Sequence, residues 1–172
     1  MERCYMNRIA AGLSLFLYLL CSACGPESIG DRYYDLPDLA KSAVHSDLNE
    51  AKALAEELLQ LASERPTDWN YGNAIHFGNM VLGQVALREG DIEGAERYLL
   101  ASGATPGSPQ LDTFGPNMSL AKELLEAGQT EAVLEYFERC AEFWEMSNDR
   151  LEYWTFQVRN DKVPNFGANL LY

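Results

Sequence analysis

Basic side chains are scarce in this sequence. Its 172 residues include 13 lysines and arginines against 26 aspartates and glutamates, which gives a formal net charge of −13. Nucleic-acid binding depends on neutralising phosphates with lysine and arginine, so this balance excludes nucleic acid as an expected partner. The same acidity disfavours adsorption to anionic lipid headgroups and mainly supports solubility.

Motifs for catalysis and metal binding are missing as well. The sequence holds only two histidines, and no G-x-S-x-G, H-E-x-x-H or phosphate-binding loop. Cys21 and Cys24 form a C-x-x-C pair without a second pair or a histidine pair, and Cys140 stands alone on an apolar helix face, as a small buried side chain does. Adjacent carboxylates such as Glu56 and Glu57 diverge on a helix. We therefore expect no enzyme activity, no cofactor and no metal site.

Sustained alternation of apolar and polar residues, which is typical of strands, is also absent. Apolar residues instead recur at helical spacing from Leu36 onward, and 47% of the residues are hydrophobic, ample for a packed core. The pattern predicts an all-α domain over residues 36–172. Its expected helices cover residues 36–44, 48–65, 71–88, 92–102, 116–127, 131–146 and 149–159.

Particular residues mark where these helices begin and end. We expect Asp47, Asp91 and Thr130 to cap helix N-termini, and Gly90 and Gly128 to end helices. Pro116 suits the first turn of a helix. Residues 103–115 are predicted to be a long connection, and the tail 163–172 is irregular but apolar enough to pack on the body.

The first 23 residues have the features of an export signal. Arg3 and Arg8 flank a basic start, and an apolar run of 12 residues follows from Ile9 to Leu20. A charged start, an apolar segment of roughly 7–15 residues and small residues at the cut are typical of a secretory signal peptide. The run is too short to span a membrane, which takes roughly 20 residues.

Cys24 follows Ser22 and Ala23, and these three residues resemble the lipobox of bacterial lipoproteins. In that family the cysteine becomes the first mature residue and carries acyl chains. Cys21 stands at −3, where the family usually has leucine. The resemblance implies lipidation of Cys24 and, through Gly25 at +2, an outer-membrane location facing the periplasm if the host has an outer membrane. Ordinary cleavage after Ala23, releasing a soluble exported protein, is the alternative.

The mature chain would then begin with a polar tether, residues 24–35, ahead of the helical domain. Removal of the leader leaves 25 acidic and 11 basic side chains, a net charge of −14.

The expected helices form three antiparallel hairpins that resemble tetratricopeptide repeats. The second hairpin matches best, with Leu82-Gly83, Gly90-Asp91, Ala95 and Leu99 at the motif's positions. The third keeps Leu120-Ala121, Leu124, Gly128 and Phe137, although Val133 replaces the small residue. The first keeps Asp47 and Ala51. Gly90 and Gly128 are 38 residues apart, whereas the family's repeat has 34, because of the insertion at 103–115.

This resemblance implies a short solenoid of stacked αα-hairpins, closed by a C-terminal packing helix, with a concave face for partners. The leading functional hypothesis is therefore a protein-binding or scaffold module in the cell envelope. Its protein partner is not specified by the sequence.

The alternative hypothesis starts from Asn73, His76 and Asn79, which recur every three residues on the helix expected at 71–88. An imidazole flanked by carboxamides could bind a small polar ligand, or His76 could act as a base. The structural interpretation is that these side chains satisfy backbone groups of the 103–115 insertion, and it is favoured because one histidine near amides is not a catalytic constellation.

Overall fold

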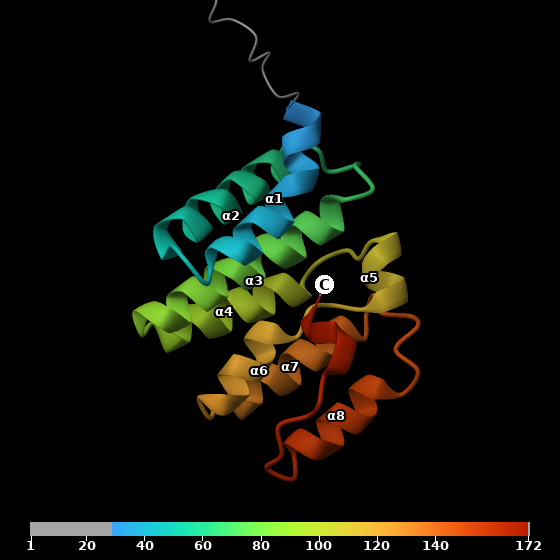
Figure 1. Cartoon of the computed structure of the whole chain (residues 1–172). Coiled ribbons are helices and arrows are strands. Elements are labelled where there is room, and N and C mark those ends of the chain that lie inside the picture. The colour runs from blue at the N-terminus through green and yellow to red at the C-terminus, as the bar shows by residue number, and fades with distance from the viewer. Residues whose placement is uncertain (1–28, 172) are drawn as a thin grey trace, which may run out of the picture.

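The computed structural model describes residues 29–171, and the regular elements within that range are all helices (Figure 1). These are α1 (Ile29–Ala43), α2 (Leu48–Ser63), α3 (Tyr71–Glu89), α4 (Ile92–Gly103), α5 (Pro109–Phe114), α6 (Ser119–Glu126), α7 (Thr130–Cys140), α8 (Arg150–Val158) and the 3₁₀ helix η1 (Gly167–Leu170). The predicted signal peptide and Cys24 lie outside the described residues.

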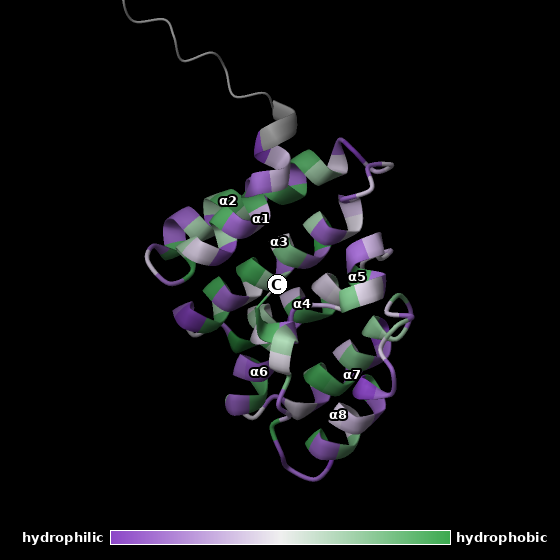
Figure 2. Ribbon diagram, turned by 45° about the vertical axis from the view of Figure 1, so that its right-hand side comes forward, coloured by the Kyte–Doolittle hydropathy of each residue, from purple (hydrophilic) through white to green (hydrophobic). Residues whose placement is uncertain are grey.

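Three antiparallel hairpins make up the body of the molecule: α1 with α2, α3 with α4, and α6 with α7. Neighbouring hairpins pack through α2 on α3 and through α4 on α7, and α8 packs on α7 at the far end (Figure 1). Figure 2 shows hydrophobic and hydrophilic residues alternating around the helices, as amphipathic packing requires. The predicted all-α fold of adjacent packed hairpins is confirmed.

Local signals in the sequence set several helix ends. The Asp47 carboxylate accepts hydrogen bonds from the backbone N–H groups of Asn49 (2.9 Å) and Glu50 (3.1 Å), and Asp91 accepts from Gly94 (2.8 Å). Gly90 adopts φ +84°, the left-handed conformation that ends α3. The expected caps at Asp47 and Asp91 and the stop at Gly90 are confirmed.

Small residues allow the second hairpin to close tightly. Gly83 and Ala95 are both buried where α3 meets α4. A Cβ atom at position 83 would collide with the Leu120 side chain and would lie 3.1 Å from Cβ of Tyr98. The repeat-like positions of this hairpin therefore lie at close helix contacts.

The tether predicted at 24–35 is too long, because α1 begins at Ile29. Tyr33, Leu36 and Ala40 are fully buried and lie at i, i+3 and i+7, so the apolar stripe starts earlier than Leu36. Pro37 lies inside α1. The stripe compensates for the hydrogen bond that proline cannot donate.

The segment predicted as a plain connection at 103–115 contains a helix. Ser108 caps α5 by accepting a hydrogen bond from the N–H of Leu111 (3.0 Å), and Pro109 takes the first helical position. Pro116, in contrast, does not open the next helix, which begins at Ser119. The N–H of Asn117 binds His76, and the N–H of Met118 binds the carbonyl oxygen of Asn169 (2.7 Å).

The limits of the last two α-helices also differ from the prediction. The helix expected at 131–146 ends at Cys140, and residues 141–146 form turns. Thr130 is its first helical residue rather than its cap, which is Gln129. The last helix runs from Arg150 to Val158, one residue shorter at each end.

The C-terminal tail packs on the body, as expected. The Phe166 ring is buried against Trp154, with centroids 4.9 Å apart. Asn169 is also buried, and its side chain donates to the carbonyl oxygens of Phe114 (3.1 Å) and Pro116 (3.0 Å). Beyond this anchor, Leu171 is 82% exposed.

Candidate binding groove

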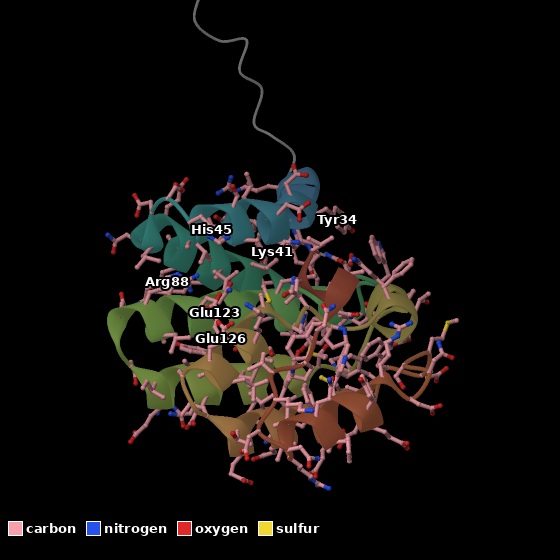
Figure 3. All side chains as sticks on the ribbon, turned by 60° about the horizontal axis from the view of Figure 1, so that its bottom comes forward. Tyr34, Lys41, His45, Arg88, Glu123 and Glu126 are labelled. Carbon is pink, nitrogen blue, oxygen red and sulfur yellow. The ribbon has the colours of Figure 1, made fainter. Side chains whose placement is uncertain are left out.

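A groove of about 520 Å³ crosses α1, α3 and α6, the first helices of the three hairpins. We call it the hairpin groove. It is lined by Asp38, Lys41, Ser42, His45, Met80, Gln84, Asn117, Ser119, Lys122, Glu123, Leu170 and Leu171. Figure 3 shows Lys41 and His45 above Arg88, Glu123 and Glu126 on this side of the molecule.

Helical spacing explains why these side chains gather. On α1 and the turn after it, Asp38, Lys41, Ser42 and His45 lie at i, i+3, i+4 and i+7, which is one helix face. Met80 and Gln84 are four residues apart on α3. Stacking of the hairpins then brings these faces together along one side.

Each lysine of the groove pairs with a carboxylate on its own helix, and Lys41 also lies over a ring on α3. Lys41 Nζ lies 2.9 Å from a carboxylate oxygen of Asp38 and 4.6 Å from the centroid of the Phe77 ring. Lys122 Nζ lies 2.9 Å from a carboxylate oxygen of Glu126. Both ammonium groups are partly exposed, so a bound partner can still reach them.

A second set of contacts joins α3 to α6 at the edge of the groove. The Gln84 amide donates to Glu123 Oε1 (2.8 Å), and Arg88 donates to Glu123 Oε2 (3.0 Å). The Arg88–Glu123 pair is partly buried on both sides. These bonds fix the distance between two groove walls that come from different hairpins.

The hairpin groove also differs in charge from the protein as a whole. It holds two of the chain's four lysines and one of its two histidines, with Asp38 and Glu123 as its acids. A larger groove of about 770 Å³ lies between α4 and α7, and we call it the outer groove. Its lining includes five glutamates and only two arginines: Glu93, Glu96, Glu131, Glu135, Glu138, Arg97 and Arg159. The hairpin groove is therefore the one with balanced charges.

His76, the centre of the alternative hypothesis, lies in the core and is fully buried. Its Nε2 accepts a hydrogen bond from the N–H of Asn117 (3.0 Å), so Nδ1 carries the proton and donates to the carbonyl oxygen of Ser102 (3.3 Å). Burial lowers the pKa of the imidazole from 6.5 to about 4. Both ring nitrogens are thus engaged with backbone, and the ring is neutral at pH 7.

The two asparagines beside His76 do not form a shared site with it. Asn73 is buried; its amide donates to Asn70 Oδ1 (2.8 Å) and its Oδ1 accepts from Ser108 Oγ (2.7 Å). Asn79 donates to the carbonyl oxygen of Ile75 on its own helix (2.8 Å). Asn73 therefore holds the 103–115 insertion through the side chain of Ser108, and His76 binds the backbone of Ser102 and Asn117 on either side of the insertion. The expectation that these side chains satisfy backbone groups of the insertion itself does not hold for Asn73 or Asn79.

The remaining repeat-like residues lie at packing or turn positions. Leu82, Leu120 and Phe137 are buried, and Gly128 adopts φ +83° after α6. The lysines and Glu123 of the hairpin groove were not predicted as functional residues. Their signal was a pair of opposite charges at i, i+3 on α1 (Asp38 and Lys41) and at i, i+4 on α6 (Lys122 and Glu126), which is also typical of a solvated face.

Among residues 29–171, no helix is long and apolar enough to cross a membrane, and no cluster of three or more metal-ligating side chains occurs. Comparison of the chain with protein-family models, with curated proteins and with solved structures gives no match.

Proposed function

We propose that this protein is an exported, lipid-anchored scaffold of tetratricopeptide-like repeats that binds a partner protein in the hairpin groove. The observation that carries this proposal is the groove itself, which runs over the first helices of three successive hairpins. A surface of this kind suits an extended or helical segment of another protein better than a small molecule, because it is open and assembled from several elements.

The groove offers a partner three kinds of contact. Lys41 and Lys122 supply partly exposed charge, while Gln84 and Ser119 supply amide and hydroxyl groups for hydrogen bonds. Met80, Leu170 and Leu171 supply apolar surface. A partner segment with mixed polar and apolar side chains fits this lining, and the charge pairs that fix the walls reduce the ordering cost of binding.

The proposal is tested by photo-crosslinking in intact bacterial cells. A photoreactive amino acid at Ser42, in the hairpin groove, should crosslink to one defined partner. The matched control is the same amino acid at Glu138, an exposed position on α7 that lines the outer groove. Crosslinking from Ser42 should be lost when Lys41→Ala and Lys122→Ala are combined, with unchanged helicity by circular dichroism.

Two outcomes would contradict the proposal. Equal crosslinking from Ser42 and Glu138 would show that the groove does not select the partner. Thermal stabilisation by a small polar metabolite, abolished in His76→Ala with the fold intact, would favour the alternative of a ligand-binding protein.

The anchor is tested separately by cell fractionation. Acylation of Cys24 should place the wild-type protein with the membranes, and Cys24→Ala should release it to the soluble exported fraction with the same helicity. A wild-type protein that is already soluble would contradict the anchor while leaving the groove hypothesis intact.

A further inference from the structure

Two aromatic side chains form an exposed pair at the N-terminal end of the described chain. The rings of Tyr34 on α1 and Trp69 in the α2–α3 loop are stacked, with centroids 5.7 Å apart and planes 12° apart. Tyr34 is 43% exposed and Trp69 is 60% exposed. We call these two residues the aromatic pair. They come from different elements, so the fold presents them together.

The aromatic pair is held rigidly from behind. Tyr34 packs edge-on against Tyr33, with centroids 5.3 Å apart, and the Tyr33 side chain is fully buried. The guanidinium of Arg65 lies 5.0 Å from the centroid of the Tyr33 ring. The Tyr34 hydroxyl donates to Asp68 Oδ2 (3.0 Å). A rigid, exposed pair loses little conformational entropy when it contacts another surface.

Tyrosine and tryptophan share a chemistry that suits one kind of surface. Each has a large apolar ring and a single polar group, and both concentrate where hydrocarbon meets lipid headgroups. The acidity of the chain, with its net charge of −13, disfavours an anionic surface but not a zwitterionic one.

The position of the pair points to the same surface. Four residues separate Cys24 from Ile29, the first residue of α1, and the five Cα–Cα steps between them can span at most about 18 Å. Tyr34 lies five residues further along the helix, which adds about 7.5 Å along its axis. A lipid on Cys24 would therefore keep the aromatic pair within reach of the bilayer. In Figure 1, α8 lies at the opposite end of the molecule from α1.

We propose that the aromatic pair docks the protein on the zwitterionic bilayer that holds its anchor, with the Trp69 ring among the lipid headgroups. This proposal rests on the proposed anchor at Cys24. It gives the body a fixed orientation, since a single flexible attachment would otherwise allow the hairpin groove to face any direction.

The experiment uses tryptophan fluorescence of the protein extracted from membranes and reconstituted into phosphatidylcholine vesicles, with or without brominated acyl chains. The chain has three tryptophans, of which Trp144 and Trp154 are 1% and 4% exposed and Trp69 alone is largely exposed. Brominated lipid should quench roughly one third of the emission, the share of one tryptophan among three. Trp69→Phe should remove the quenched component.

A matched control places a reporter at the far end of the molecule. Tyr153 on α8 is as exposed as Trp69, so Trp69→Phe combined with Tyr153→Trp provides an exposed tryptophan away from the anchor. This reporter should not be quenched by brominated lipid but should be quenched by acrylamide in the water.

The outcomes separate the docking from the anchor. The docking would be overturned if Trp69 of membrane-bound protein were quenched by acrylamide and not by brominated lipid. The aromatic pair would then face water, where a soluble partner could bind it. Equal lipid quenching of the two reporters would overturn it as well, since the contact would then have no direction. A wild-type protein absent from the membrane fraction would overturn the anchor, and the docking with it.

Discussion

Acidification should destabilise this fold through His76. The imidazole is fully buried, and burial lowers its pKa to about 4, the charge of Lys41 acting in the same direction and the Ser102 carbonyl in the opposite one. The unfolded chain has a histidine pKa of about 6.5. Between these two values the unfolded chain binds a proton at His76 that the folded protein does not bind, so stability falls as pH falls.

The magnitude follows from the two pKa values. Linkage between pKa 4 and 6.5 predicts a loss of about 2 kcal/mol at pH 5 relative to pH 7.5, rising to about 3 kcal/mol below pH 4. The hydrogen bond to Arg32 lowers the pKa of Glu57, so protonation of Glu57 also lowers the stability of the fold. This loss begins only as pH falls through the pKa range of an ordinary glutamate. The interval from pH 7.5 to 5 therefore isolates the histidine.

The assay is urea unfolding at a series of pH values. Wild type should lose its 2 kcal/mol mainly between pH 6.5 and 5. His76→Gln should be less stable at pH 7.5, by about 1–3 kcal/mol, because at least one of its backbone partners loses a hydrogen bond in the core. The variant should then show little further loss at pH 5.

The other histidine provides the control, because His45 is exposed and lines the hairpin groove. His45→Gln should keep the wild-type pH dependence. The reasoning is refuted if wild type unfolds at the same urea concentration at pH 5 and pH 7.5, or if His76→Gln keeps the full slope.

Three further predictions concern stability. Ala95→Leu and Gly83→Leu should each cost about 1–3 kcal/mol, because both add atoms where α3 and α4 are in close contact; unchanged urea midpoints would mean that this contact is wrong. Asp47→Ala should cost about 0.5–2 kcal/mol through loss of the α2 cap, and Asp47→Asn should recover most of it. Gly115→Ala should lower the melting temperature, because φ is +89° there and a Cβ atom would collide with the Trp144 ring; an unaltered melting temperature would refute the strain.

Features decided within a few residues could be predicted from the sequence. The cap at Asp47 and the left-handed stop at Gly90 each depend on a local hydrogen-bond pattern, and both agree with the structure. The order of helices follows from apolar spacing for the same reason. The start of α1 was missed, because Tyr33 supports the helix through burial against other helices, which local spacing before Leu36 does not indicate.

The hairpin groove could not be predicted, because it depends on residues that are far apart in the chain. Gln84 and Arg88 meet Glu123 across 39 and 35 residues, and no periodicity within α3 indicates that partner. The fixed position of the 103–118 segment also depends on residues that are far apart in the chain. Gly72 leaves room for the backbone of Gly107, and a Cβ atom at position 72 would collide with it. Sequence spacing showed that the connection was long, but not that it was fixed to α3.

The buried histidine and the groove are connected through the start of α6. His76 holds the N–H of Asn117 (3.0 Å), and the Asn117 side chain accepts from the N–H of Ser119 (2.8 Å), the first residue of α6 and part of the groove lining. His76 therefore supports the start of α6 from the core, although the ring does not line the groove. Partner binding to His76→Gln should follow its folded fraction as temperature or pH is varied. Loss of binding by fully folded His76→Gln would instead mean that recognition depends on the position of α6 that the His76–Asn117 hydrogen bond supports.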